Sequence, residues 1–419
     1  MLFRSFCFCD ILQEQPSSFG LDAKKVYQPD KYHLYLIINS FGKTIVEKNQ
    51  QEKYFKKIFV TNDFSQSNIL SLINSCLTKN NNFTVITNSE ETMPLCGKVR
   101  VALGIDSQDY SRFYDKHVMK TKLHSNYSLS LPKYKIIDLN KYLSHGNSYL
   151  DQLTETMAFP LFVKPVQMYS SVNLKKITDR NMLYEWAKQT NPSDYFEIDE
   201  FIEGTMYHCD SYIQEGKVLF SFVSENSRPC YNFTVGQMKG TIVLPQDNPD
   251  HIRIAHAAEQ ALITIGMPQA GVTHLEVIKT KEQKLYFIEV AHRSPGCLIP
   301  KMYEVHSGID TITSHFLLQI DPDFYPIPQC GTYAAWACYP KSPGIVTELN
   351  NLPYHINCQY EIDWRVKIGD KITSYSKFGR DYTGTIFMKH ENFDALYNEF
   401  QLINDINLCV ISPEYQLVE

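Results

Sequence analysis

The sequence predicts a mixed α/β (α+β) protein with three successive parts: an N-terminal α/β domain over 1–110, a central domain over 111–324 and a strand-rich C-terminal domain over 325–419. Three observations predict this class. Strand and helix signals alternate near the N-terminus, which is typical of a small open α/β sheet. Two hairpin patterns flank one long amphipathic helix pattern in the centre. After residue 325, proline and glycine separate short apolar stretches, which favours strands.

Composition narrows the class of protein. The chain has 419 residues, 43% of them hydrophobic, enough for two or three buried cores. Its net charge of -6 argues against a nucleic-acid partner. The eleven cysteines are scattered without a CxxC spacing, which favours buried thiols. No apolar stretch approaches the roughly 20 residues of a membrane span, and no secretory signal is present, so we expect a cytoplasmic protein without membrane contact.

The N-terminal part alternates strands with a helix. Apolar stretches predict strands at 33–39, 57–61, 82–87 and 99–105. Between the second and third of these, apolar residues recur at helical spacing, namely Ile69, Leu72, Ile73, Cys76 and Leu77. No GxGxxG follows any of these strands, so the sequence does not indicate a dinucleotide site.

The central part contains more elements, each marked by its own signal. In chain order we expect a helix over 108–123, a strand over 159–165, a helix over 179–190, a strand over 195–204, a hairpin over 207–224, a helix over 248–266 and a hairpin over 271–291. Pro249 in the first turn and Gly266 after the last turn mark the ends of the long helix. A final helix is expected over 393–403.

The hairpin over 271–291 carries a glutamate in each of its otherwise apolar strands. A short polar loop sets a register in which Glu276 faces Glu289. Period-two alternation places His274 and Arg293 on the same face as the two glutamates. The opposite face is expected to fill the core and consists of Leu275, Val277, Ile288 and Val290.

The pair of glutamates requires a compensating charge. Two carboxylates directly opposite each other have Cβ atoms roughly 5 Å apart and repel by about 3 kcal/mol at an effective dielectric constant near 20. Paired oxygen ligands suit Mg²⁺, which completes its shell with water and substrate phosphates. Two alternatives remain open: a solvated outer face on which both side chains turn into water, or a different register.

The order of these features resembles the ATP-grasp superfamily: a strand ending in Lys-Pro, an acidic strand closed by glycine, a helix, and a glutamate-bearing hairpin closed by arginine. The stretches 207–229, 239–245 and 271–296 are most similar to carboxylate-amine ligases of the carnosine-synthase-like or L-amino acid ligase group. The resemblance implies an ATP-grasp fold with a Rossmann-like N-terminal pre-ATP-grasp domain and a strand-rich C-terminal lid. It also implies an ADP-forming ligase that joins a small carboxylate, such as an amino acid, to an amine through an acyl phosphate.

The resemblance further implies roles for individual residues. Glu276 and Glu289 would hold Mg²⁺ or Mn²⁺, Arg293 would act with Glu289 in catalysis, and Lys116 and Lys164 would contact the phosphates of ATP. Further contacts to ATP are implied for Ser171, Glu200, Phe201, Ile202 and Leu275. Contacts to the substrates are implied for His208, Asp210, Arg228 and His292, although a histidine in a strand is as often a structural residue. Ligases of this fold are often homodimers.

Several positions depart from the family pattern. The phosphate loop over 166–173 contains no glycine, and Met206 stands where the family usually has a glutamate for the ribose. Ala291 replaces a common metal-binding asparagine, and Ser294 and Pro295 stand in place of a Gly-Gly pair. These departures motivate an alternative, a nucleotide-binding regulatory module that has lost catalysis. A biotin-type carboxylase shares the fold, but the sequence contains no Met-Lys-Met acceptor.

Overall fold

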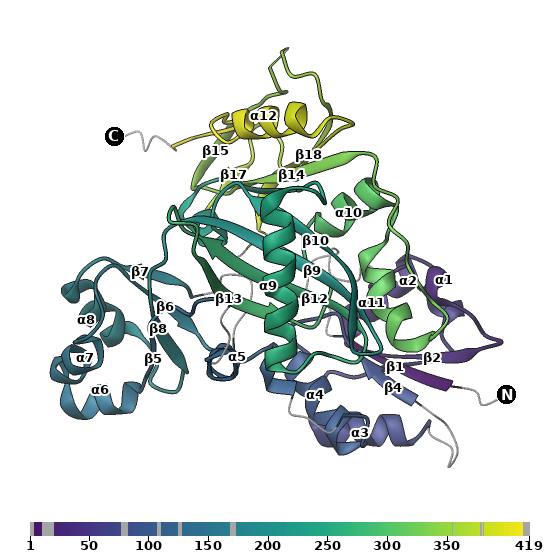
Figure 1. Ribbon diagram of the computed structural model, residues 1–419. Coiled ribbons are helices and arrows are strands. Elements are labelled where there is room, and N and C mark those ends of the chain that lie inside the picture. Colours follow the sequence, from purple (N-terminus) through teal and green to yellow (C-terminus); the bar gives the residue numbers. More distant parts are fainter. Residues whose placement is uncertain are drawn as a thin grey trace.

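The computed structural model describes residues 4–10, 21–76, 83–106, 110–124, 128–167, 173–353, 355–377, 379 and 381–413. Figure 1 shows three regions around one large sheet: an N-terminal region with its own sheet, a small lobe formed by α6 to α8 with β5 to β8, and a C-terminal layer that carries α12. Among the described residues, the strands form one eight-stranded sheet, two four-stranded sheets and one three-stranded sheet.

The N-terminal sheet has the parallel order β3-β2-β1-β4. Its strands are β1 (Arg4–Asp10), β2 (Tyr32–Ile38), β3 (Lys57–Val60) and β4 (Phe83–Ile86), and its helices are α1 (Ala23–Val26), α2 (Ser40–Lys48), α3 (Gln66–Asn74) and α4 (Met93–Ala102). The strand predicted over 99–105 is wrong, because residues 99–102 form the last turn of α4. Met93, Cys96 and Val99 are buried at helical spacing, so this face of the helix packs inward.

The small lobe is an antiparallel sheet covered by helices. Its strands lie in the order β5-β8-β6-β7 and are β5 (Tyr134–Ile137), β6 (Leu161–Pro165), β7 (Lys175–Ile177) and β8 (Phe196–Glu200). Its helices are α6 (Leu139–His145), α7 (Asn147–Thr154) and α8 (Arg180–Gln189), and α5 (Lys116–Leu123) precedes them after the 3-10 turn η2 (Tyr110–Phe113). The predicted helix over 108–123 is thus split into two parts.

The large sheet has the order β13-β12-β9-β10-β11-β14-β18-β16. Its strands are β9 (Thr205–Gln214), β10 (Lys217–Asn226), β11 (Lys239–Val243), β12 (Gly271–Lys279), β13 (Leu285–Ala291), β14 (Tyr333–Pro340), β16 (Gln359–Trp364) and β18 (Tyr382–His390). Both predicted hairpins are confirmed, and Glu215 and Gly216 turn the first with positive φ angles of 53° and 70°. Such a turn matches the twist of the flanking strands.

Helices cover both faces of this sheet. The predicted long helix is confirmed as α9 (Pro249–Ile265), which crosses one face (Figure 1) and packs Ile254, Ala258 and Leu262 against the sheet. On the opposite face, α10 (Ile299–Ser307) and α11 (Thr311–Ile320) pack at one end of the strands. The rest of that opposite face carries the polar side chains described below.

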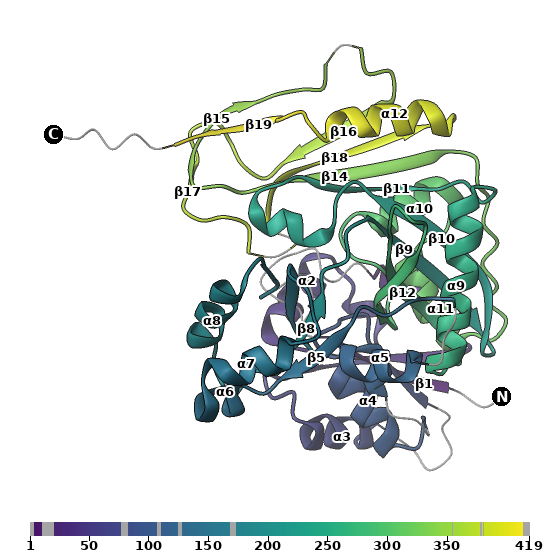
Figure 2. The same cartoon turned by 60° about the vertical axis from the view of Figure 1, so that its left-hand side comes forward.

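The C-terminal region is rich in strands, as expected. A small sheet of order β17-β15-β19 contains β15 (Gly344–Leu349), β17 (Lys371–Ile372) and β19 (Cys409–Ser412), and α12 (Phe393–Ile403) covers the neighbouring strands. Figure 2 shows β14 beside β11 and β18 on the far side of β14. The division into three domains therefore stays a prediction, since the C-terminal strands continue the large sheet without a break.

The cysteines and the helices can be compared with the expectations from composition. The cysteines from Cys76 to Cys409 within the described chain are free thiols, and several are buried. No described helix combines the length and the apolar character that a membrane crossing requires.

Candidate active site

One face of the large sheet forms the floor of a cavity of about 670 Å³. Every strand of the sheet contributes a side chain to it: Glu289 from β13, Glu276 from β12, His208 from β9, Asn226 from β10, Lys239 from β11, Trp336 from β14, Thr385 from β18 and Asp363 from β16. Helix α9 lies on the other face (Figure 1). The sheet thereby gathers polar groups from segments that are far apart in the sequence.

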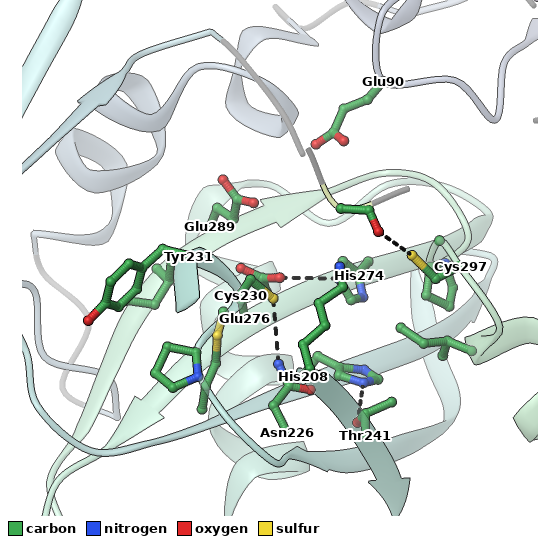
Figure 3. A pocket seen from close by; sticks show the side chains of 18 of the residues that line it. Glu90, His208, Asn226, Cys230, Tyr231, Thr241, His274, Glu276, Glu289 and Cys297 are labelled. Atoms are coloured by element: carbon green, nitrogen blue, oxygen red, sulfur yellow. Dashed lines mark hydrogen bonds and ion pairs between the residues drawn. The ribbon is translucent and has the colours of Figure 1, made fainter. Parts of the chain in front are cut away.

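The register predicted for the glutamate hairpin is confirmed at its important point. Glu276 lies opposite Glu289, and both side chains line the cavity (Figure 3). A β-bulge next to this pair was not predicted: Val277 pairs with Phe287, so Ile288 is an extra residue in β13. Ile288 consequently lines the cavity, and the prediction that it fills the core is wrong. Phe287 fills the core in its place.

Positive charges surround Glu289. Lys116, at the start of α5, places its Nζ 2.8 Å from Glu289 Oε2. Burial raises the pKa of Glu289, but the positive charges of Lys116, Lys164 and Arg293 lower it by more. The pKa of Glu289 therefore lies below its ordinary value. A charged carboxylate opposite Glu276 supplies the hard oxygen ligands that Mg²⁺ prefers.

Lys164 lines the cavity and is held by two acidic residues of β8. Its Nζ lies 2.8 Å from Asp199 Oδ2 and 3.3 Å from Glu197 Oε1. The same carboxylate oxygens bind the Nζ of Lys120, at 2.5 Å and 2.8 Å respectively, and the Lys120 side chain is completely buried. Sequence reasoning missed Lys120, although its spacing of four residues from Lys116 puts both lysines on one face of α5.

The chain that follows β8 forms an apolar end of the cavity. Glu200, Phe201 and Ile202 line this end. The ring of Tyr231, missed by sequence reasoning, lies 5.4 Å from that of Phe162 and 5.9 Å from that of Phe201. The same end is lined by Leu174, Met206, Ile278 and Ile288. This slot suits a planar base, and its contact with a nucleotide stays a prediction.

Arg293 is fixed by a contact with the N-terminal part of the chain. It donates to Glu90 Oε2 at 2.9 Å and to the Ser294 carbonyl at 2.8 Å, while the Ser294 backbone and hydroxyl both donate to Asn88 Oδ1. Figure 3 shows Glu90 across the cavity from Glu289. Sequence reasoning missed Asn88 and Glu90 because no local pattern reveals a contact between residues 203 positions apart.

Two cavity-lining histidines share one buried carboxylate. His208 Nδ1 and His274 Nδ1 donate to the two oxygens of Asp210, at 2.6 Å and 2.7 Å, and the Tyr303 hydroxyl donates to the same group at 2.6 Å. Burial raises the pKa of Asp210, but the histidines bring it well below its ordinary value. Burial lowers the pKa of His274, yet Asp210 and Glu276 raise it to about 10, so His274 is protonated at neutral pH.

This network also bears on metal binding. The ligand atoms of His208, Asp210 and His274 lie within 4.8 Å of one another, which a metal ion could span. Hydrogen bonds already occupy both Asp210 oxygens, however, so we assign the network a positioning role for the two histidines. Asp210 itself does not line the cavity, and it reaches a substrate only through them.

Other predicted contacts differ in their placement. Arg228 lines the cavity and pairs with the exposed Asp405 at 3.3 Å. Leu275 lies in the core beneath α9, because it alternates with Glu276 along β12, and its predicted contact with ATP is wrong. His292 is buried, donates from Nε2 to the Ala270 carbonyl at 2.9 Å and accepts from the Tyr110 hydroxyl, so the predicted substrate contact is wrong too. Ser171 lies outside the described residues.

Comparisons with known proteins agree with this geometry. Residues 123–304 match the family model described as D-ala D-ala ligase C-terminus. The L-arginine-specific L-amino acid ligase of Bacillus subtilis is 24% identical over 189 residues, which cover 42% of this chain and 45% of that protein. The match thus spans less than half the length of this curated relative.

Solved structures match over almost the whole chain. An L-amino acid ligase from Bacillus licheniformis superposes with a TM-score of 0.70 at 17% identity, covering 99% of this chain and 100% of that chain. N5-carboxyaminoimidazole ribonucleotide synthetase from Thermotoga maritima gives 0.60 at 13% identity, covering 98% and 100%. The chain therefore has the ATP-grasp fold, and its residues 123–304 are similar to the D-ala D-ala ligase C-terminus.

Proposed function

We propose that this protein is an ATP-dependent carboxylate-amine ligase, which forms an amide through an acyl phosphate and releases ADP and inorganic phosphate. One observation carries the proposal: the opposed Glu276 and Glu289 meet Lys116, Lys164 and Arg293 in a single cavity. The family match and the similarity to L-amino acid ligases support it. An amino acid is the expected carboxylate substrate.

The two glutamates fit a magnesium ion. They offer hard oxygen donors from adjacent strands, and Lys116 keeps Glu289 in its charged form. Glu276 and Glu289 would therefore hold Mg²⁺. The bound ion would neutralise charge on the phosphates of ATP.

The lysines supply point charges at the same place. The Nζ of Lys116 already lies against one carboxylate, and a flexible ammonium can move between that carboxylate and a phosphate oxygen. Lys164 lies between the acidic residues of β8 and the cavity. The apolar slot around Phe201 and Tyr231 would hold the base and align the γ-phosphate with the glutamates.

Arg293 is suited to orient the reacting carboxylate. Glu90 and the Ser294 carbonyl fix its guanidinium, whose planar fork matches a carboxylate or an acyl phosphate. A carboxylate oxygen attacks the γ-phosphorus and the bond to ADP breaks. The amine nitrogen then attacks the acyl carbon, phosphate leaves, and the amine gives one proton to the phosphate or to water.

The direct test is phosphate release from ATP and Mg²⁺, measured with pools of amino acids given singly and in pairs. We expect release that requires two substrates, with an amide product visible by mass spectrometry and loss of both signals in Glu289→Gln. Nucleotide binding without release from any pool would contradict the ligase and favour a non-catalytic binding module. Release that depends on bicarbonate would favour a carboxylase.

A further inference from the structure

Lys239 is a charged residue of the cavity that has no role in the reaction described above. Lys239 begins β11, pairs with Cys338 of β14 across the sheet, and lines the cavity. Its Nζ lies 5.1 Å from the centre of the Phe233 ring. Gly379 packs so closely that a Cβ there would come within 2.6 Å of this Nζ. The ammonium is thus held in place by neutral groups.

Four other cationic side chains that line the cavity each have a carboxylate partner. Lys116 pairs with Glu289, Lys164 with Asp199 and Glu197, Arg228 with Asp405, and Arg293 with Glu90. Within the described part of the chain, the ammonium of Lys239 has neither an ion pair nor a hydrogen bond. Burial lowers the pKa of Lys239, but nearby negative charge, that of Glu276 included, raises it above its ordinary value. Lys239 is therefore a charged group without a fixed partner.

The position of Lys239 relative to the glutamates defines what it can bind. Strands β9 and β10 separate β11 from β12, so a strand spacing of about 4.8 Å places the two backbones about 14 Å apart. Figure 3 shows the same order, with Asn226 and Thr241 away from Glu289 and with His208 and His274 between them. A group bound at Lys239 is therefore held from a different strand than the groups at the glutamate pair, although the charge of Glu276 still acts on Lys239.

The surroundings of Lys239 fit a small polar ligand group. The cavity near it is also lined by Trp336, Cys297 and Tyr382, and the guanidinium of Arg365 lies 3.8 Å from the centre of the Tyr382 ring. Among the described residues, the C-terminal strands add one carboxylate to the lining, that of Asp363. This carboxylate does not pair with Lys239. This end of the cavity consequently presents net positive charge.

We propose that one of the two substrates carries an anionic group, a carboxylate or a phosphate, besides the groups that react, and that Lys239 binds it. The inference rests on the proposed ligase activity and names the class of its substrate: an acidic amino acid or another dicarboxylate, a carboxylate-bearing amine, or a phosphorylated equivalent. A charge-assisted hydrogen bond to a partly buried ammonium is expected to tighten binding about tenfold or more.

Binding can be measured without turnover. We would titrate the protein with glutarate and with butyrate, and with O-phosphoserine and with serine, by calorimetry in the presence of ADP and Mg²⁺. The probe with the extra anionic group in at least one pair should bind about tenfold tighter or more. Lys239→Met should abolish that preference and Lys239→Arg should keep most of it. The preferred pair also distinguishes a carboxylate from a phosphate.

A matched control exists on the rim. Lys301 also stacks on a phenylalanine, 4.5 Å from the Phe387 ring centre, but its partner is the exposed Glu361 outside the cavity lining. Lys301→Met should leave the preference unchanged. Equal binding within both pairs in the wild-type protein, or a preference that survives Lys239→Met, would overturn the proposal.

Turnover separates this inference from the proposed function. With an active substrate pair, Lys239→Met should raise the KM of the acidic substrate about tenfold or more and should change the KM of ATP less, because the Lys239 ammonium packs on Phe233 and not on the rings of Phe162, Phe201 or Tyr231. The substrate whose KM changes is the one that carries the group. No phosphate release in the wild type would contradict the ligase, and the binding titrations would still decide the role of Lys239.

Discussion

Lys120 shows how completely this protein buries some of its charges. Its ammonium lies between Glu197 and Asp199, which also bind Lys164, so two positive and two negative charges balance in a buried site at the edge of the cavity. Burial lowers the pKa of Lys120, and the neighbouring Lys164 lowers it further. These two lysines and two carboxylates are stable only together, because the removal of one charge leaves an opposite buried charge without compensation.

Removal of Lys120 should therefore destabilise the fold. Lys120→Met leaves two buried carboxylates facing one lysine, and we expect the free energy of unfolding to fall by about 3 to 5 kcal/mol in urea titrations. Lys188→Met removes an exposed lysine paired with Glu185 and should have no measurable effect. Similar stability for the two variants would show that the buried group does not act as one unit.

His274 should make stability depend on pH. Its pKa is about 10 in the folded protein and near 6.5 when unfolded, since Asp210 and Glu276 outweigh the effect of burial. The folded state thus binds the extra proton, so the stabilisation is complete below pH 6.5 and is lost as the pH rises towards 10. The difference in unfolding free energy between wild type and His274→Asn should shrink over this range in urea titrations. A constant difference would exclude the protonated form.

At the scale of elements, the bulge in β13 decides which side chains reach the cavity. Ile288 and Glu289 are adjacent, yet both line the cavity, whereas Phe287 lies in the core. We expect Ile288→Ser to raise the KM of ATP several-fold with little change in stability. Phe287→Ala should cost about 3 to 5 kcal/mol of unfolding free energy. An unbulged hairpin would require the opposite pattern, in which Ile288→Ser destabilises the fold and Phe287→Ala raises the KM of ATP. Urea titrations and steady-state kinetics on both variants would distinguish the two patterns.

The elements that sequence reasoning predicted well have complete local signals. Helix α9 has Asn248 as its cap, a proline in its first turn and Gly266 at its end, and the glutamate register follows from a short loop. The error over 99–105 arose because Val99, Val101 and Leu103 also alternate with period two. Only packing against the sheet shows that Val99 and Cys96 share one buried helical face. The bulge has no local signal at all.

At the scale of the whole molecule, the N-terminal part of the chain contributes directly to the site through Glu90. We expect Glu90→Gln to lower kcat about 10-fold or more, since Arg293 loses the charge that orients it, while the KM of ATP changes little. Glu304→Gln removes a different contact of the N-terminal part of the chain, with Lys25, outside the cavity lining, and should leave kcat unchanged. Steady-state kinetics would contradict this role if both variants behaved alike.

The sequence therefore predicted the residues on the central strands better than those that surround them. Lys116, Lys164, Glu276, Glu289 and Arg293 stand in patterns that extend over a few positions, and the structure gathers them in one cavity. Asn88, Glu90, Tyr231 and Lys239 reach that cavity through long-range packing. A contact between distant segments leaves no periodicity in the sequence, so only the folded chain reveals it.

The continuity of the large sheet has a consequence for protein synthesis. Strand β11 ends at Val243 and its neighbour β14 begins at Tyr333, about ninety residues later. At about 5 to 20 residues per second, a ribosome needs roughly 5 to 20 s to deliver that partner. During this time one edge of the nascent sheet has unpaired backbone groups, which invites aggregation. Chaperone binding to nascent chains arrested before residue 333 should therefore exceed binding to chains arrested after residue 390.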